Sequence, residues 1–126
     1  MVKNPTRMWT LFEYQYRDAG NFKVRGEIAL EGVADPENWK HALKSLEDDL
    51  FIAEQLDIPP LYAKLYQWSG GPSAADHCWH EFVALKVVEH SETDRRTPRA
   101  GTAAEFVRRL AAVSEWQGAL SPHFAL

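Results

Sequence analysis

An alternating pattern on both sides of a turn constrains the fold of this chain more than any other sequence feature. In residues 8–18, MWTLFEYQYRD, aromatic rings recur at every second position from Phe12 to Tyr16. Residues 22–32, FKVRGEIALEG, largely alternate apolar and charged side chains in the same way, and Ala19-Gly20-Asn21 separates the two segments. Period-two patterning around a Gly-Asn turn predicts a β-hairpin with one face on a core and the other in water.

Two stretches carry the signals of helix ends. Asp35 suits an N-cap and Pro36 suits the first helical position, and apolar side chains follow at helical spacing, so we expect a helix over residues 36–49. A capping-box pattern at residues 102–105 starts a second apolar stripe, which Gly118 would close.

The segments between these helices are less regular. Residues 51–60, FIAEQLDIPP, indicate a second short helix that the two prolines must end, and residues 61–68 indicate a short helical or irregular segment. Residues 81–88, EFVALKVV, are largely apolar on both faces and rich in β-branched side chains, which predicts a central strand. Residues 90–101 are polar and contain a proline, so we expect an exposed loop.

Together these elements predict a single α+β domain over residues 1–126. The expected fold is an antiparallel sheet of at least three strands with two or three helices packed on one face, in the element order ββα(α)βα. We expect residues 1–7 and 119–126 to be peripheral termini. A hydrophobic content of 45% is sufficient for a globular core.

Charge and cysteine content narrow the setting and the partners. The formal net charge of −4 argues against non-specific nucleic-acid binding. The single cysteine, Cys78, cannot form an internal disulfide, and no segment has the pattern of a signal peptide or a membrane span, so we expect a cytoplasmic protein. A basic group is present but is diluted by acidic neighbours; it consists of Arg95, Arg96, Arg99, Arg108 and Arg109.

Residues 76–81, DHCWHE, concentrate groups that can bind a metal or move a proton. On a helix, His77, His80 and Glu81 would lie on one side and could hold a zinc ion for a metal-assisted hydrolase or nuclease. On a strand, the two histidines point to opposite faces, and the three side chains cannot converge. The β-rich run that follows favours the strand, and the ligand count for a zinc site is short, so we expect no metal and no cofactor.

On a strand, structural roles account for the same segment. We expect Asp76 and His77 to hydrogen-bond with backbone groups where the strand begins. Trp79 should pack in the core, and Glu81 should pair with a basic residue across the sheet. A nucleophilic Cys78 would need an accessible, electropositive setting, and small buried cysteines are the commoner case.

A second polar group surrounds the tip of the hairpin. Tyr16, Arg17 and Asp18 form a candidate ligand-binding set, in which an oriented guanidinium would recognise a carboxylate or phosphate. We favour the alternative that Asp18 and Asn21 stabilise the turn and that Arg17 is a solvated strand residue. The alternation with Phe12 predicts that Tyr16 faces the helices.

Aromatic side chains elsewhere in the chain suggest a third kind of site. Five of them could line a small-molecule pocket between the sheet and the helices. Aromatic side chains in such number are more often part of a core. The five are Trp39, Tyr62, Tyr66, Trp68 and Trp79.

Three segments resemble those of a group of small bacterial proteins of unknown activity. EYQYRDAGNFK at residues 13–23 resembles the pattern Y-R-D-x-x-N-Y/F-K, and DHCWHEF at residues 76–82 resembles D-H-x-W-H-E. LDIPPLY, at residues 56–62, lies between them. The resemblance spans residues 10–88; it implies a bacterial origin and an intracellular setting, and it names no reaction.

The sequence therefore predicts a non-enzymatic binding or protein-interaction module. Its partner is expected to be a protein bound at a sheet edge or in an aromatic-lined groove. An exposed edge would also allow a homodimer by strand pairing. The metal-assisted enzyme and the small-molecule-binding protein stay as alternatives. The candidate ligand-binding residues are Tyr16, Arg17, Asp18, Asp76 and Trp79.

Overall fold

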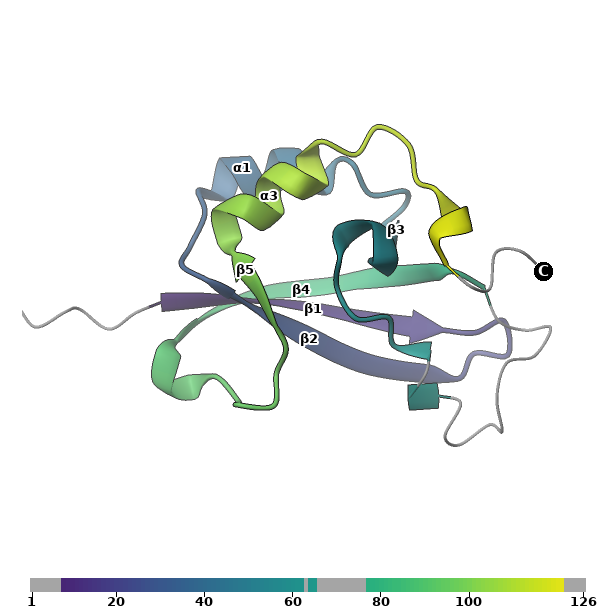
Figure 1. The fold of residues 1–126 in the computed structure, drawn as a ribbon, viewed down its shortest axis with the longest axis horizontal. Helices are drawn as coiled ribbons and strands as arrows, with labels where there is room; N and C mark the ends of the chain where they lie inside the picture. The colour runs from purple at the N-terminus through teal and green to yellow at the C-terminus, as the bar shows by residue number, and fades with distance from the viewer. Residues whose placement is uncertain (1–7, 63, 66–76, 122–126) are drawn as a thin grey trace, which may run out of the picture.

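The computed structural model describes residues 8–62, 64–65 and 77–121, and its central feature is a five-stranded sheet in the order β3-β4-β1-β2-β5 (Figure 1). This arrangement confirms the predicted α+β class. The strands are β1 (Met8–Arg17), β2 (Lys23–Glu31), β3 (Leu50–Ile52), β4 (Trp79–Glu89) and β5 (Arg99–Thr102). The α-helices are α1 (Pro36–Leu43) and α3 (Ala103–Ala111), and the 3-10 helices are η1 (Ala53–Leu56), η2 (His90–Glu92) and η3 (Gly118–Leu120).

β1 and β2 form the predicted antiparallel hairpin. In the turn between them, the side chain of Asp18 accepts a hydrogen bond from the backbone N–H of Phe22 (2.9 Å). Asn21 has a φ of 68°, a left-handed conformation that asparagine tolerates better than most residues. These contacts confirm the turn-forming roles predicted for Asp18 and Asn21.

β4 lies on the other side of β1 and confirms the predicted central strand. It pairs antiparallel with β1 over most of its length, while β3 pairs only with its first residues. A β-bulge interrupts the β1–β4 register, because Glu13 pairs with Ala84 but the next residue, Tyr14, pairs with Phe82. Val83 is therefore an extra residue, and it reverses the side-chain alternation of β4 between its two halves.

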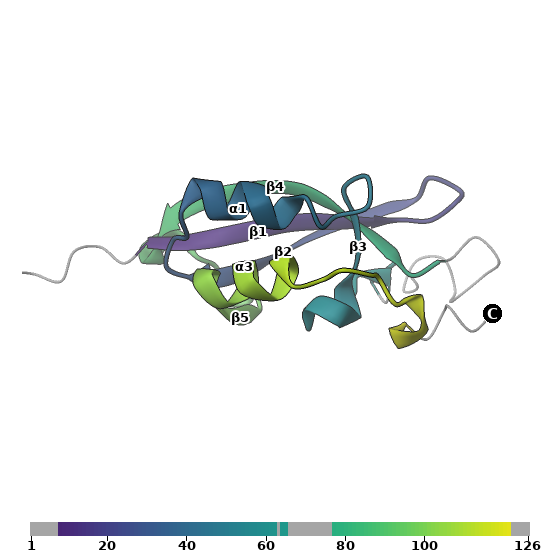
Figure 2. The same cartoon turned by 90° about the horizontal axis from the view of Figure 1, so that it is seen from above.

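α1 and α3 lie side by side on one face of the sheet (Figures 1 and 2). The ring of Phe12 in β1 contacts Trp39 of α1 and Phe106 of α3, with ring centroids 6.4 and 4.9 Å apart. Tyr14 and Tyr16 are buried in the same core, as the alternation of β1 predicts. The other face of the sheet, which we call the open face, carries no α-helix from the described part of the chain.

One end of the open face is covered by a small second cluster. Trp9, Leu11, Ala29 and Val88 are buried together there. The guanidinium of Arg99 lies 4.7 Å from the centroid of the Trp9 ring, a cation–π contact between β5 and β1. The polar side chains of β1 on the open face therefore lie farther along the strand, toward the hairpin turn.

The sheet is mixed, so the prediction of an antiparallel sheet is wrong for one strand. β5 runs parallel to β2, with Ala29 opposite Arg99 and Glu31 opposite Thr102. Residues 90–101 are consequently not one exposed loop, since they contain η2 and most of β5. The polar composition of residues 90–101 gave no sign of β5, because a short strand at the edge of a sheet can pair through its backbone without much apolar surface.

α1 is shorter than the helix predicted over residues 36–49, because a tight turn follows it. Asp48 and Asp49 have φ values of 52° and 67°, which a helix cannot contain. Across this turn Glu47 and Leu50 exchange both backbone hydrogen bonds, each at 2.9 Å. Three leucines follow the helical spacing of α1 but lie in different structures. Leu43 is in the helix, Leu46 is in the bend that follows it, and Leu50 begins β3.

One further helix prediction is confirmed in part and another is wrong. The short helix predicted within residues 51–60 is present as the 3-10 helix η1, whereas residues 51 and 52 belong to β3. α3 ends at Ala111, so Gly118 does not close it and instead begins η3. After the helix, the indole of Trp116 donates a hydrogen bond to the carbonyl of Ser45 (2.8 Å), which holds the chain across the helical layer.

Some predictions fall partly outside the described residues. Within residues 61–68, positions 62, 64 and 65 are helical, and residues 63 and 66–68 are not described. The terminal ranges 1–7 and 122–126 also lie outside. Among the residues that the structure describes, no helix is long and apolar enough to cross a membrane.

The capping box at the start of α3 gives a direct test of the fold. The Thr102 hydroxyl accepts a hydrogen bond from the N–H of Glu105 (3.0 Å), and the Glu105 carboxylate accepts one from the N–H of Thr102 (3.0 Å). Thr102→Ala should lower the free energy of unfolding, measured with urea, by about 1 kcal/mol because the cap is lost. Thr102→Ser keeps the hydroxyl, and an equal loss in this variant would contradict the capping role.

Candidate functional site

On the open face, two segments that are far apart in the sequence meet near the hairpin turn. The β1–β4 register places Gln15 opposite Glu81, and the Glu81 carboxylate lies 3.0 Å from the guanidinium of Arg17. The side chain of Gln15 donates a hydrogen bond to the same carboxylate (3.2 Å). The Arg17–Glu81 ion pair confirms that Glu81 pairs with a basic residue across the sheet.

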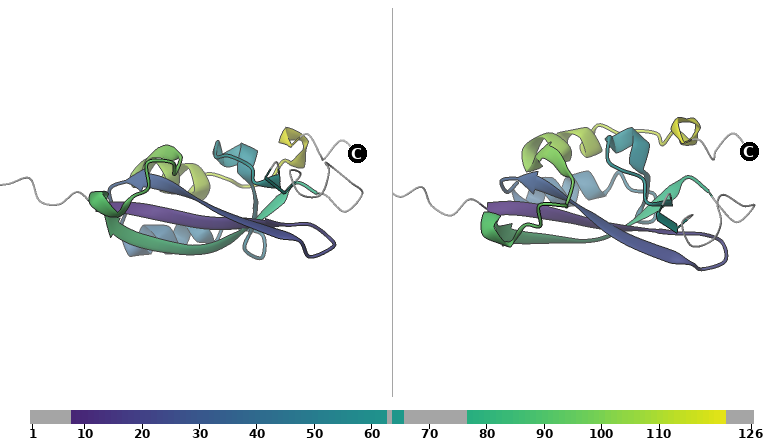
Figure 3. Two further views of the ribbon diagram at one scale, coloured as in Figure 1. Left: turned by 90° about the horizontal axis from the view of Figure 1, so that it is seen from below. Right: turned by 60° about the horizontal axis from the view of Figure 1, so that its bottom comes forward.

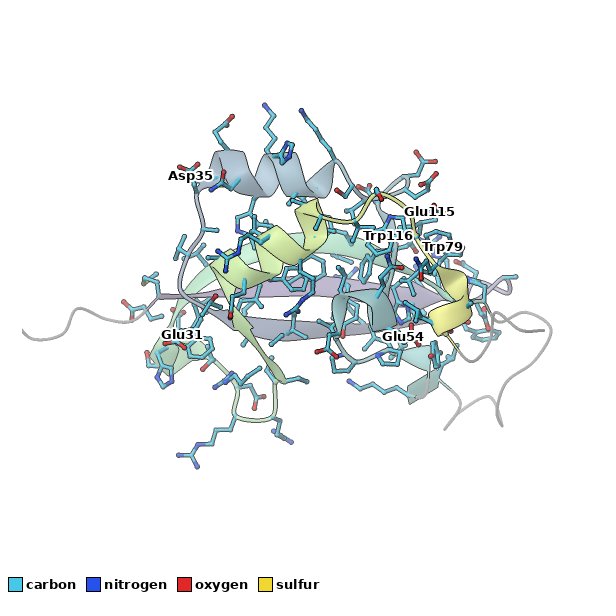
Figure 4. The ribbon with its side chains drawn as sticks, turned by 45° about the horizontal axis from the view of Figure 1, so that its top comes forward. Glu31, Asp35, Glu54, Trp79, Glu115 and Trp116 are labelled. Atoms are coloured by element: carbon cyan, nitrogen blue, oxygen red, sulfur yellow. The ribbon has the colours of Figure 1, made fainter. Side chains whose placement is uncertain are left out.

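These side chains border an open hollow of about 400 Å³. Trp79, at the start of β4, lies at the opposite end of the molecule from Asp35 (Figure 4), and it is half-buried. The hollow combines apolar surface from β3 and β4 with charged groups from the hairpin. We call it the open-face hollow; it is lined by Arg17, Asp18, Leu50, His77, Trp79 and Glu81.

The bulge at Val83 decides which side chains reach the open-face hollow. On one side of the bulge, Lys86 lies on the open face, where it forms an ion pair with Glu13 (3.2 Å). On the other side the alternation is reversed, so Glu81 lies on the open face and His80 points into the core. Without the extra residue, His80 and Glu81 would exchange faces.

His77 ties the start of β4 to the end of β1 through both ring nitrogens. Its Nδ1 accepts a hydrogen bond from the backbone N–H of Trp79 (3.0 Å), and its Nε2 donates to the carbonyl of Arg17 (2.7 Å). The backbone N–H of His77 donates to the hydroxyl of Tyr16 (3.1 Å). These contacts place the ring proton on Nε2 and confirm that His77 hydrogen-bonds with backbone groups.

His80 is completely buried on the helix-facing side of the sheet. Its Nε2 accepts a hydrogen bond from the N–H of Leu61 (2.9 Å), so its proton is on Nδ1. Burial lowers the pKa of His80 to about 4, and the carbonyl of Cys78 offsets part of this effect. Aromatic rings surround the imidazole at centroid distances between 5.3 and 6.1 Å; they belong to Tyr14, Tyr16, Phe51 and Tyr62.

The three residues considered as a metal or catalytic set do not converge. His77 and Glu81 border the open-face hollow, whereas His80 lies in the core on the other side of the sheet. In the described ranges, no three His, Cys, Asp or Glu side chains are placed to hold a metal ion together. The prediction that Trp79 packs in the core is also wrong, because the reversed alternation gives that position to His80.

Cys78 and Tyr16 are both buried and do not line the open-face hollow. Burial raises the pKa of the Cys78 thiol, which keeps it protonated, whereas a nucleophile needs the thiolate. Tyr16 instead supports the hollow from the core side, where its hydroxyl accepts the N–H of His77. The sequence predicts that Tyr16 binds a ligand, but Tyr16 does not line the hollow; it contacts His77, which does.

The structure describes three of the other four members of the predicted ligand-binding set. Arg17, Asp18 and Trp79 come together in the open-face hollow, whereas Asp76 lies outside the described residues. Leu50 lines the hollow although the sequence placed it next to a helix. Its true position could have been suggested by the adjacent Asp48-Asp49 pair, since two aspartates in succession are a turn signal.

The aromatic residues proposed to line a small-molecule pocket do not form one. Trp39 and Tyr62 are buried in the helix-facing core, and Trp79 lies on the open face. Tyr66 and Trp68 lie outside the described residues. Trp39 and Tyr62 therefore act as core residues, and Trp79 is the member of this set that borders a hollow.

Comparison with known proteins leaves the site to be interpreted from its own geometry. No family model matches the chain, and no curated protein or solved structure shows significant similarity to it. The role of the open-face hollow is therefore inferred from the contacts, burial and charges of the residues that line it.

The buried state of His80 predicts a specific dependence of stability on pH. Below about pH 6.5 the unfolded chain binds a proton at this histidine, while the folded chain does so only near pH 4. The free energy of unfolding should therefore fall by up to about 3 kcal/mol from this group as the pH drops from 6.5 to 4. Urea unfolding at a series of pH values measures it.

His80→Gln should remove most of that pH-dependent loss, because the glutamine side chain does not titrate and its amide oxygen can still accept the N–H of Leu61. His41→Gln, at an exposed position in α1, is the matched control and should keep the wild-type pH dependence. If His80→Gln and wild type lose stability in parallel between pH 6.5 and 4, the buried neutral state of His80 is disproved.

Proposed function

We propose that this chain is a non-enzymatic binding module that holds a segment of a partner protein in the open-face hollow. Two side chains that flank the same hollow support this proposal. Trp79 is half-buried, and the side chain of Arg17 is 41% exposed. Tryptophan and arginine are the side chains most enriched among energetically dominant contacts in protein interfaces. Leu50 adds apolar surface beside them.

The contacts of the candidate reactive groups favour binding over catalysis. Both ring nitrogens of His77 are engaged with the backbone, and Glu81 is held by Arg17 and Gln15. His80 is inaccessible from the open face. A general acid or base needs a free lone pair or proton within reach of a substrate. His77 offers neither without breaking a backbone contact, His80 is buried, and the Glu81 carboxylate is paired with Arg17.

The charges of the hollow favour a neutral partner segment. Arg17 is balanced by Glu81, and Asp18 adds a further negative charge at the rim, so an anionic group would meet net repulsion. The Arg17–Glu81 bonds use Nη2, and Nε is buried without an acceptor among the described residues, so a partner would reach the guanidinium at Nη1. A backbone carbonyl of an extended segment fits the remaining guanidinium donors, with an apolar side chain against Trp79 and Leu50.

A small neutral molecule is the second candidate for the open-face hollow. Its volume of about 400 Å³ lies within the range of roughly 300–1,000 Å³ found for small-molecule sites. Its openness to solvent favours the protein partner, because small-molecule sites usually enclose most of the ligand surface. For the setting, we propose a bacterial cytoplasm, in keeping with the resemblance noted above and with a single, buried and unpaired cysteine.

The binding role is tested by crosslinked pull-down from native bacterial lysate with substituted bait. Trp79→Ala should reduce recovery of the bound partner at least about tenfold, because truncating an interface tryptophan typically costs 2 kcal/mol or more, a loss of roughly 30-fold in affinity. Arg17→Met is a second variant that keeps the length of the side chain and should also weaken recovery. The melting temperature of each variant shows whether it is folded.

Val33→Ala is the matched control, because Val33 is an exposed apolar side chain that does not line the hollow. It should recover the same proteins as wild type. If folded Trp79→Ala recovers every partner as well as Val33→Ala does, the open-face hollow is not the binding site.

A further inference from the structure

The outer edge of β4 is largely unpaired. β3 pairs with β4 at Trp79, His80 and Glu81, and the N–H of Phe82 donates to the carbonyl of Asp49 (2.8 Å). From Val83 to Glu89, no strand in the described part of the chain pairs with the side of β4 that faces away from β1. We call this segment the free edge; Figure 3 shows β4 along the border of the sheet with β3 at one end only.

The free edge lacks the features by which proteins usually protect such strands. Short length, proline and outward charges discourage strand pairing, and the outermost strands here are indeed short, with β3 spanning three residues and β5 four. The free edge, in contrast, has no proline and reads VALKVVE. Its lysine, Lys86, is held in an ion pair by Glu13 (3.2 Å), and Val87 is an exposed valine with 50% of its surface accessible.

We propose that the free edge of β4 pairs antiparallel with the free edge of a second copy of this chain. Unpaired backbone N–H and C=O groups gain hydrogen bonds when another strand is added, and an apolar strand gains burial at the same time. A second copy is the partner that brings an equally long, equally apolar and equally unpaired strand. Pairing also leaves neither Lys86 without a counter-charge, because each already has its own Glu13 as an ion-pair partner.

The two-fold axis of the dimer lies at Val87. In an antiparallel pair related by a two-fold axis perpendicular to the sheet, each residue faces a residue on the same face of the sheet. The axis therefore passes midway between one residue and its own counterpart in the second copy. An axis at Leu85 would place Glu89 opposite Glu81 of the second copy, a position that β3 already occupies there. An axis at Lys86 would place the two lysines directly opposite each other, which destabilises strand pairs.

The Val87 register avoids both problems. It places Val87 opposite its counterpart, Lys86 opposite Val88, and Leu85 opposite Glu89, whose N–H already donates to the Glu92 carboxylate (2.9 Å). The two five-stranded sheets then join into one continuous sheet. Because the open faces of both copies lie on the same side of that sheet, the two open-face hollows stay accessible, at opposite ends of the dimer.

Sedimentation velocity of the full chain over a concentration series of about 1 µM to 1 mM tests the pairing, because this range covers weak self-association. Wild type should pass from monomer to dimer within it. Val87→Lys should raise the dissociation constant at least about tenfold, since it places two lysines face to face at the axis. Leu120→Lys is the matched control, because Leu120 is also 50% exposed but lies in η3, and it should dimerise like wild type.

A disulfide at the axis gives a second readout that does not depend on weakening the dimer. The native Cys78 is buried, so Val87→Cys introduces an accessible thiol that should form an intermolecular disulfide under mild oxidation. Leu120→Cys should crosslink much more slowly at the same concentration. The pairing is overturned if wild type stays monomeric throughout the series, if Val87→Lys dimerises as well as Leu120→Lys, or if the two cysteine variants crosslink at equal rates.

Discussion

The β-bulge at Val83 is the local constraint on which the site and the surface of this protein depend. One extra residue in β4 lets a single apolar strand serve two environments with opposite alternation. At one end it keeps Lys86 on the open face, beside Glu13; at the other it keeps Glu81 on that same face, beside Arg17. The bulge also directs His80 into the core, where the aromatic side chains of β1 and β3 enclose it. The register of β4, and not the chemical character of its residues, therefore decides which side chains line the open-face hollow.

Features set by neighbouring residues could be predicted from the sequence, and features set by long-range pairing could not. The hairpin turn at Asp18 and Asn21 and the capping box of Thr102 are local, because side chains there bond backbone only a few residues away. The strand pairing of Leu50 and of Arg99 depends on β4 and β2, and nothing in either short segment alone indicates it. The exchange of roles between Trp79 and His80 has the same origin: hydrophobicity favours a buried tryptophan, but the bulge buries the histidine.

The molecule separates its structural and its interacting groups between the two faces and one edge of the sheet. The helix-facing side holds the aromatic core, which contributes stability, and His80, whose pKa is lowered by burial. The proposed partner site occupies the open face near the hairpin turn, where Arg17 and Trp79 are accessible. The proposed self-association uses the edge of β4, which neither the core nor the hollow requires. Binding and pairing can therefore operate together, because they use different surfaces.

The backbone contacts of His77 and His80 indicate a structural role for the histidine-rich segment, with each ring held in one tautomer. Long-range ¹H–¹⁵N NMR correlation at neutral pH reads the protonated nitrogen of each imidazole directly. We predict opposite tautomers, with the proton of His77 on Nε2 and that of His80 on Nδ1, both unchanged when zinc is added. If both rings instead average between tautomers like the exposed His41, or shift together on addition of zinc, the structural role is contradicted and the segment is a metal or proton-transfer site.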